Sequence, residues 1–131
     1  MTAVSPQSIS SRPGAKSAAS KFEPAIDLVH LARQTMDDPA LENELLEMFD
    51  RQSGRIVDEL TKMDQGGATA GADLAHKLRG SALSLGAHRV ASAAQAFEEC
   101  CLAGGADQAR LLQVLGQVVA EARAEIGRLT Q

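Results

Sequence analysis

Residues 75–87, AHKLRGSALSLGA, place a histidine, His76, four residues before a glycine, Gly80. In a helix these two residues share a face, and the glycine weakens the helix by about 1 kcal/mol relative to alanine. A neutral imidazole nitrogen is a nucleophile that can form a covalent bond to a transferred group. Lys77 and Arg79 add positive charge on either side of the histidine. Because both cations could stabilise a phosphoryl group on the imidazole, the pattern favours phosphoryl chemistry at His76.

The helix that carries His76 is expected to bury its opposite face. At about 100° per residue, Leu74, Leu78 and Leu85 fall within one narrow arc, which small side chains flank. These small residues are Ala70, Ser81 and Ala82. We predict that this arc faces the core and that the helix ends at a turn marked by Gly86.

The exposed face of the same helix is unusual in composition. His76 lies about 200° from Leu74, and its neighbours on that side are Ala72, Gly80 and Leu83. A solvated helix face normally carries Glu, Lys or Gln. Small and apolar residues instead predict a surface on which another protein docks beside the imidazole, with Gly80 leaving room for close approach.

The composition of the 131-residue chain restricts the class of protein. Hydrophobic residues make up 44% and aromatic residues 2%, so the core must be aliphatic, which favours helices. The net charge of −4 and the pI near 5.3 argue against a nucleic-acid partner or an anionic membrane, because either would require a basic surface. The length suits a single domain with one core.

Hydrophobic spacing predicts the organisation of the chain. Residues 1–21 are rich in Ser, Ala, Pro and Gly and are expected to form a disordered tail, whereas residues 22–131 form the folded domain. We expect a short helix over residues 24–35, opened by Pro24, and a long one over 39–63 that Asp38 caps. The predicted inward stripe of the long helix is Leu41, Leu45, Met48, Gln52, Ile56, Leu60 and Met63.

Two further helices complete the prediction. One covers residues 87–102 with Val90, Ala94, Phe97 and Cys101 turned inward. The last helix carries Leu111, Leu115, Val118, Ala122, Ile126 and Leu129 at helical spacing. Four long amphipathic helices joined by short loops predict an all-α fold, an antiparallel up-and-down four-helix bundle with the short first helix as a lid.

The cysteines and the apolar segments indicate the cellular compartment in which the protein is expected to work. Cys100 and Cys101 are adjacent on a predicted helix and point in different directions, so they are poorly placed to form a disulfide. No segment has the length and purity of a membrane span, and no signal peptide is evident. We expect a soluble protein of a reducing, cytoplasmic compartment.

The run His76-Lys77-Leu78-Arg79-Gly80-Ser81-Ala82, followed by Leu85-Gly86-Ala87, closely resembles the signature of histidine phosphotransfer (HPt) domains. That signature is H-x-x-K-G-S/A, a small apolar run, and L-G-A. The segments LLEMFDRQSGRIVDEL and AAQAFEE also stand where the family has them, and the resemblance covers about residues 25–129. It implies a four-helix bundle, the fold that the periodicity predicts independently.

The resemblance also implies a mechanism. His76 would accept a phosphoryl group from an aspartate of a receiver domain and return it to the aspartate of another, in a hybrid sensor histidine kinase, a response regulator or both. This chain would bind no cofactor or metal, because the family's Mg²⁺ and acidic residues belong to the receiver. Gly80 matches the family's close-approach position. Arg79 departs from the usual lysine, which keeps the charge and changes the hydrogen-bond geometry.

A polar partner for the imidazole is predicted from the level of each residue along the helices. The chain reverses near Gly86, so residues as far beyond the turn as His76 is before it should lie beside it. That level falls between Gln95 and Glu98. The family places a polar side chain at the position of Glu98. Either residue could bond one ring nitrogen and leave the other free.

The sequence allows one alternative to phosphotransfer and disfavours two other functions. A bundle that docks receivers without carrying phosphate, as a scaffold or sequestering module, is the main alternative. A di-iron bundle is excluded because the sequence has no Glu-x-x-His pair. An autonomous kinase is disfavoured because no glycine-rich nucleotide loop is present. We expect a monomer, and we interpret His30 and His88 as surface residues near helix ends.

Overall fold

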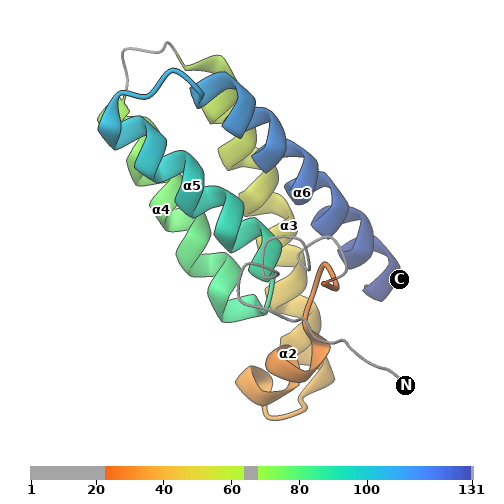
Figure 1. Cartoon of the computed structure of the whole chain (residues 1–131). Coiled ribbons are helices and arrows are strands. Elements are labelled where there is room, and N and C mark those ends of the chain that lie inside the picture. The colour runs from red at the N-terminus through yellow and green to blue at the C-terminus, as the bar shows by residue number, and fades with distance from the viewer. Residues whose placement is uncertain (1–22, 64–67, 131) are drawn as a thin grey trace, which may run out of the picture.

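The computed structural model describes residues 23–63 and 68–130. In this part of the chain there are five helices and no strand. The helices are α2 (Leu28–Thr35), α3 (Pro39–Lys62), α4 (Ala68–Leu85), α5 (His88–Ala103) and α6 (Gln108–Leu129), coloured along the chain in Figure 1. The predicted tail of residues 1–21 lies outside the described residues.

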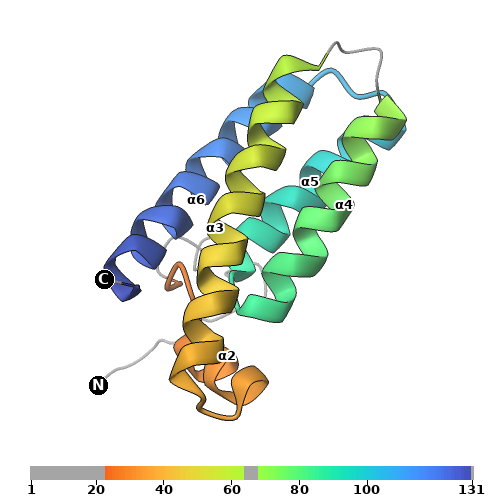
Figure 2. The same ribbon diagram turned by 180° about the vertical axis from the view of Figure 1, so that it is seen from behind.

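The four long helices form an antiparallel bundle, as the sequence predicts. Each helix packs against the next along the chain, and α6 returns to α3 and closes the ring. Figures 1 and 2 show this arrangement from opposite sides, with α2 lying at the end of the bundle where α4 turns into α5. There α2 contacts both α3 and α4.

The start of α3 agrees with the prediction, whereas the start of α2 does not. Asp38 caps α3, since its carboxylate accepts hydrogen bonds from the backbone N–H groups of Ala40 and Leu41 at 3.0 and 3.3 Å. The predicted helix from residue 24 begins only at Leu28. Asp27 is held extended before it because its N–H donates to the Gly86 carbonyl at 2.9 Å and its side chain caps α2.

The buried face of α3 differs from the predicted stripe. The residues buried on this helix are Leu46, Phe49, Ser53, Ile56 and Leu60. Of the predicted stripe, Ile56 and Leu60 are buried, whereas Leu41 and Met48 are exposed. The predicted stripe stepped mostly by four residues, and such a row drifts around a helix of 3.6 residues per turn. It therefore left the core face in the first half of the helix.

The other helices mostly bury the predicted residues. On α5 all four predicted inward residues, Val90, Ala94, Phe97 and Cys101, are buried. On α6 the buried set includes Leu115, Ala122 and Ile126, while Val119 takes the place predicted for Val118. On α4, Leu78, Ala82 and Leu85 are buried, Leu74 and Ser81 are partly buried, and Ala70 is exposed. The helix begins at Ala68.

The turn between α4 and α5 requires glycine. Gly86 has a φ of +90°, a backbone conformation that side chains rarely adopt, and a Cβ there would lie 2.9 Å from the carbonyl oxygen of Asp27. This turn also accepts the Asp27 N–H. Gly86 thus allows both the reversal of the chain and the attachment of α2.

Replacing Gly86 by alanine is expected to destabilise the domain by roughly 1–3 kcal/mol, because both the backbone conformation and the Asp27 carbonyl oppose a side chain. Gly127→Ala on α6 is the matched control. Nothing lies within 4 Å of a Cβ there, so this helix should gain about 0.5–1 kcal/mol. Urea denaturation of both variants measures the difference. A Gly86→Ala protein as stable as the wild type would contradict this view of the turn.

Candidate functional site

Close packing of α4 against α5 sets the geometry of the site. Both helices bury several small residues, which include Ala75 and Ala82 on α4 and Ala91 and Ala94 on α5. A Cβ on Gly71 would already be in van der Waals contact with Cys101 and Phe97 of α5. Small side chains let helix axes approach closely. A residue of α5 can therefore reach across to a side chain on the outer face of α4.

His76 and Glu98 are brought together across this interface. The imidazole is 61% exposed, the Glu98 side chain is 19% exposed, and Nδ1 of His76 lies 3.1 Å from Oε2 of Glu98. An ionised carboxylate only accepts hydrogen bonds, so Nδ1 is the protonated nitrogen and donates to Glu98. Nε2 then keeps its lone pair. The bond leaves an exposed nucleophilic nitrogen on a ring held from the other side.

Gln95, the other predicted partner of the imidazole, has a different contact. Its amide nitrogen donates to Oε2 of Glu99 at 3.1 Å, one turn further along α5. Gln95 is exposed and makes no hydrogen bond to His76. Of the two predicted partners, Glu98 is the one that hydrogen-bonds to the imidazole.

Arg79 and Lys77 differ in their relation to the imidazole. Nη2 of Arg79 lies 3.3 Å from Nδ1 of His76, the same nitrogen that faces Glu98. A protonated Nδ1 cannot also accept a hydrogen bond, so Arg79 contributes a neighbouring positive charge there. Lys77 is exposed and forms no ion pair within the described residues.

The exposed face beside His76 is smaller than predicted. Leu83 is 47% exposed, and a Cβ on Gly80 would meet nothing within 4 Å. No contact within the described chain therefore requires glycine at position 80. Ala72 was predicted on this face, and that prediction is wrong, since Ala72 is 3% exposed and belongs to the core. A helical wheel of α4 alone does not reveal that neighbouring parts of the fold cover this position.

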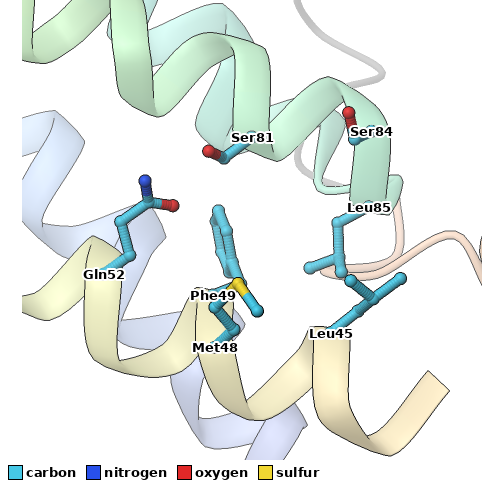
Figure 3. Close-up of a pocket in the computed structure, with 7 residues that line it drawn as sticks. All are labelled: Leu45, Met48, Phe49, Gln52, Ser81, Ser84 and Leu85. Carbon is cyan, nitrogen blue, oxygen red and sulfur yellow. The ribbon is translucent and has the colours of Figure 1, made fainter. Parts of the chain in front are cut away.

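An apolar groove between α3 and α4 borders this face and was missed from the sequence. It has a volume of about 170 Å³. Figure 3 shows Gln52 and Ser81 at one end, Leu45 and Leu85 at the other, and Phe49 between them. Its lining residues are Leu45, Met48, Phe49, Gln52, Ser81, Ser84 and Leu85. Met48 is 55% exposed. The sequence analysis assigns Met48 to the inward stripe of the helix. For that reason it does not identify Met48 as an exposed apolar residue that could line a groove.

His30 and His88 are more than surface residues. Nε2 of His30 donates to the Ser84 carbonyl at 3.1 Å, Nε2 of His88 lies 3.3 Å from Oδ2 of Asp27, and the two rings meet edge to face. The pKa of Asp27 is lowered, first by the backbone hydrogen bond from His30 and also by His88. Together these contacts attach α2 to the end of α4 that carries the groove.

Two further features of the described residues bear on the class of protein. Residues 23–63 and 68–130 contain no group of three His, Cys, Asp or Glu residues arranged to hold a metal ion. Within the same ranges, none of the helices has the length and apolar character needed to cross a membrane.

Both cysteines are free thiols, and burial, followed by the neighbouring Cys100, raises the pKa of Cys101.

Comparison with known proteins agrees with this geometry. The model of the Hpt domain matches residues 44–130. The fold is similar to the crystal structure of a rice protein described as a histidine-containing phosphotransfer protein, with a TM-score of 0.73 and 20% sequence identity. The match covers 90% of this chain and 87% of the rice chain. A search of curated proteins found no significant match. The bundle, the exposed His76 and the family match over its residues lead to one conclusion: this chain belongs to the Hpt domain family.

Proposed function

We propose that this protein relays a phosphoryl group between receiver-domain aspartates, with His76 as the phosphoacceptor. The observation that carries the proposal is the 3.1 Å contact between Nδ1 of the exposed His76 and Oε2 of Glu98, which in the neutral ring favours the proton on Nδ1 and leaves the lone pair on Nε2. A scaffold that only docks receivers would not need that tautomer. Histidine phosphotransfer in phosphorelays is also the general role of the family to which the chain belongs.

The transfer itself needs few groups from this chain. The lone pair on Nε2 forms the N–P bond, the P–O bond to the receiver aspartate breaks, and its electron pair returns to that carboxylate. Phosphoryl transfer depends chiefly on positioning and on charge neutralisation. We propose that Mg²⁺ and the acidic residues come from the receiver, and that this chain is a phosphocarrier without kinase activity of its own.

Docking of the receiver would use the exposed face of α4 and the neighbouring groove. Gly80 leaves the helix backbone uncovered one turn from His76, and Leu83 offers apolar surface one turn further. Met48 and Ser84 extend this surface onto the groove between α3 and α4. Partly exposed apolar side chains around a bare backbone suit a partner that must approach the imidazole closely.

Arg79 is proposed to neutralise the transferred phosphoryl group. Its guanidinium already lies 3.3 Å from the imidazole, and its long side chain can swing from Nδ1 toward a group on Nε2. Arginine can offer two N–H donors to phosphate oxygens. Lys77, exposed on the same helix, would add positive charge at longer range.

We propose a receiver of a hybrid sensor histidine kinase, a response regulator or both as the partner. The net charge of −4 and the absence of a basic cluster in the sequence disfavour nucleic acid and anionic membranes. The two free thiols suit a reducing, cytoplasmic compartment. We further propose that the chain acts as a monomer, because the exposed apolar face is the one assigned to the receiver.

Replacing His76 by glutamine is expected to abolish phosphorylation while the fold persists, since His76 is exposed and the core does not depend on it. Incubation with radiolabelled phosphorylated receivers, followed by gel analysis, measures acid-labile and alkali-stable label. His88→Gln is the matched control and should keep the label. Label that survives in His76→Gln would refute His76 as the acceptor.

The proposed tautomer can be measured directly. ¹⁵N NMR of the imidazole at neutral pH should show Nδ1 protonated and Nε2 unprotonated in the wild-type protein. In Glu98→Ala the ring loses its acceptor, and protonated Nε2 should then predominate as it does in free histidine. A wild-type spectrum with Nε2 protonated would contradict the role assigned to Glu98.

Enlarging residue 80 should obstruct the receiver without harming the fold. Gly80→Gln is expected to reduce receiver binding and transfer from the receiver at least tenfold, because the new side chain occupies the approach to His76. Phosphorylation by the small donor phosphoramidate should change much less. Gly127→Gln, at an equally open helical glycine on α6, is the control and should transfer normally. Normal exchange with the receiver by Gly80→Gln would exclude Gly80 from the interface.

A further inference from the structure

We propose that the negative charge of Glu98 keeps the proton on Nδ1 of His76 while the phosphoryl group is on Nε2, and so keeps the phosphorylated ring able to give the group away. The inference rests on the proposed function and adds a role in donation. In the proposed function, Glu98 selects the tautomer that accepts phosphate. Here the same carboxylate acts on the product of that step.

Among the groups around the imidazole, Glu98 is the one placed to retain the proton on Nδ1. Among the described residues of α5, Glu98 is the one that hydrogen-bonds to the imidazole, and Glu99 is instead paired with Gln95. Arg79, on the same helix as His76, is the other charged group in contact with it. In the described residues, no hydrogen bond or ion pair from α2 or α3, the other helices packed against α4, reaches the ring. Asp73 and Lys77, also on α4, are exposed, and neither forms a hydrogen bond or ion pair with the ring within the described residues. Of the carboxylates around His76, Glu98 is the one hydrogen-bonded to Nδ1, so it is placed to retain the proton against the neighbouring arginine.

Proton balance shows why retention matters. When Nε2 forms its bond to phosphorus and Nδ1 keeps its proton, the ring becomes positively charged. The phosphoryl group can then leave to an aspartate oxygen while the N–P electron pair returns to Nε2, and the leaving group is a neutral imidazole. If the Nδ1 proton has been lost to solvent, the leaving group is an imidazolate anion, which is far poorer. Retention by Glu98 makes transfer in both directions free of net proton exchange.

The negative charge of Glu98, and not only its ability to accept a hydrogen bond, retains the proton on Nδ1. A glutamine at position 98 could accept the same hydrogen bond through its amide oxygen, but without charge. Hydrogen bonds to ionised groups are roughly twice as strong as neutral ones, and partial exposure of the pair reduces the difference. We therefore expect an effect of roughly threefold to tenfold on the rate at which the phosphorylated ring loses its phosphoryl group at alkaline pH.

The test compares the wild type with Glu98→Gln in the full chain. Both are loaded with phosphoramidate, the donor is removed, and ³¹P NMR follows hydrolysis of phosphorylated His76 from about pH 6 to about pH 9. Both rates should fall as pH rises and the Nδ1 proton is lost. The Glu98→Gln profile should fall at lower pH, so that the variant is roughly threefold to tenfold slower at the alkaline end. A merely structural role would not move the profile along the pH axis.

Glu99→Gln removes the same charge one residue away and serves as the control, with a profile expected to match the wild type. Coincident profiles for the wild type and Glu98→Gln, or faster alkaline hydrolysis in the variant, would overturn the inference. Either result would leave the proposed function intact if His76 still exchanges phosphate with a receiver. Failure of His76 to take label from both phosphoramidate and a receiver would instead overturn the proposed function, and this inference with it.

Discussion

The close approach of α4 and α5 is the constraint on which the rest of the site depends. Gly71 of α4 lies against Phe97 and Cys101 of α5, and both helices bury several alanines, so they lose some of the stabilisation that larger apolar side chains would provide. In return, the short distance between the helices lets Glu98 reach His76 from a partly buried position. A wider bundle would leave the imidazole free to rotate, and the tautomer would be set by water. The packing of α4 against α5 thus places the carboxylate that we propose selects the tautomer of His76.

The sequence predicted those features that depend on one helix or one turn. The wheel of α4 placed His76 outside and Leu78 inside, and the turn at Gly86 put Glu98 level with the histidine. The predictions from sequence were wrong where the exposure of a residue depends on how neighbouring helices pack. Ala72 stands one turn from His76 on the predicted exposed face, yet it is buried in the core. Met48 fitted an apolar row, yet α4 leaves it at the rim of a groove.

The choice between Gln95 and Glu98 illustrates a related limit. Both residues stand at the level of His76, and the rise per residue cannot distinguish them. Their azimuth around α5 can, but the sequence gives that azimuth only relative to the buried face. The sequence predicts that Ala94 and Phe97 are buried, but not which flank of that buried face borders α4. The structure places Glu98 on the flank that reaches His76 and leaves Gln95 exposed. Predicting the direction of a side chain therefore requires knowledge of how the helices pack. Its level along the bundle follows from the rise per residue alone.

The end of the bundle near α2 links stability to the docking face. Asp27 caps α2, contacts His88 and donates its N–H to the Gly86 carbonyl, while His30 bonds the carbonyl of Ser84 at the groove. The α4 backbone that carries the groove is thereby held at its C-terminal end. The lowered pKa of Asp27 means that this attachment strengthens the fold above the pKa of the unfolded carboxyl and weakens as pH falls through the folded value. At neutral pH the carboxylate is fully charged. The surface that we propose for receiver docking is therefore held at one end in the free protein, which would reduce the entropy that docking must overcome.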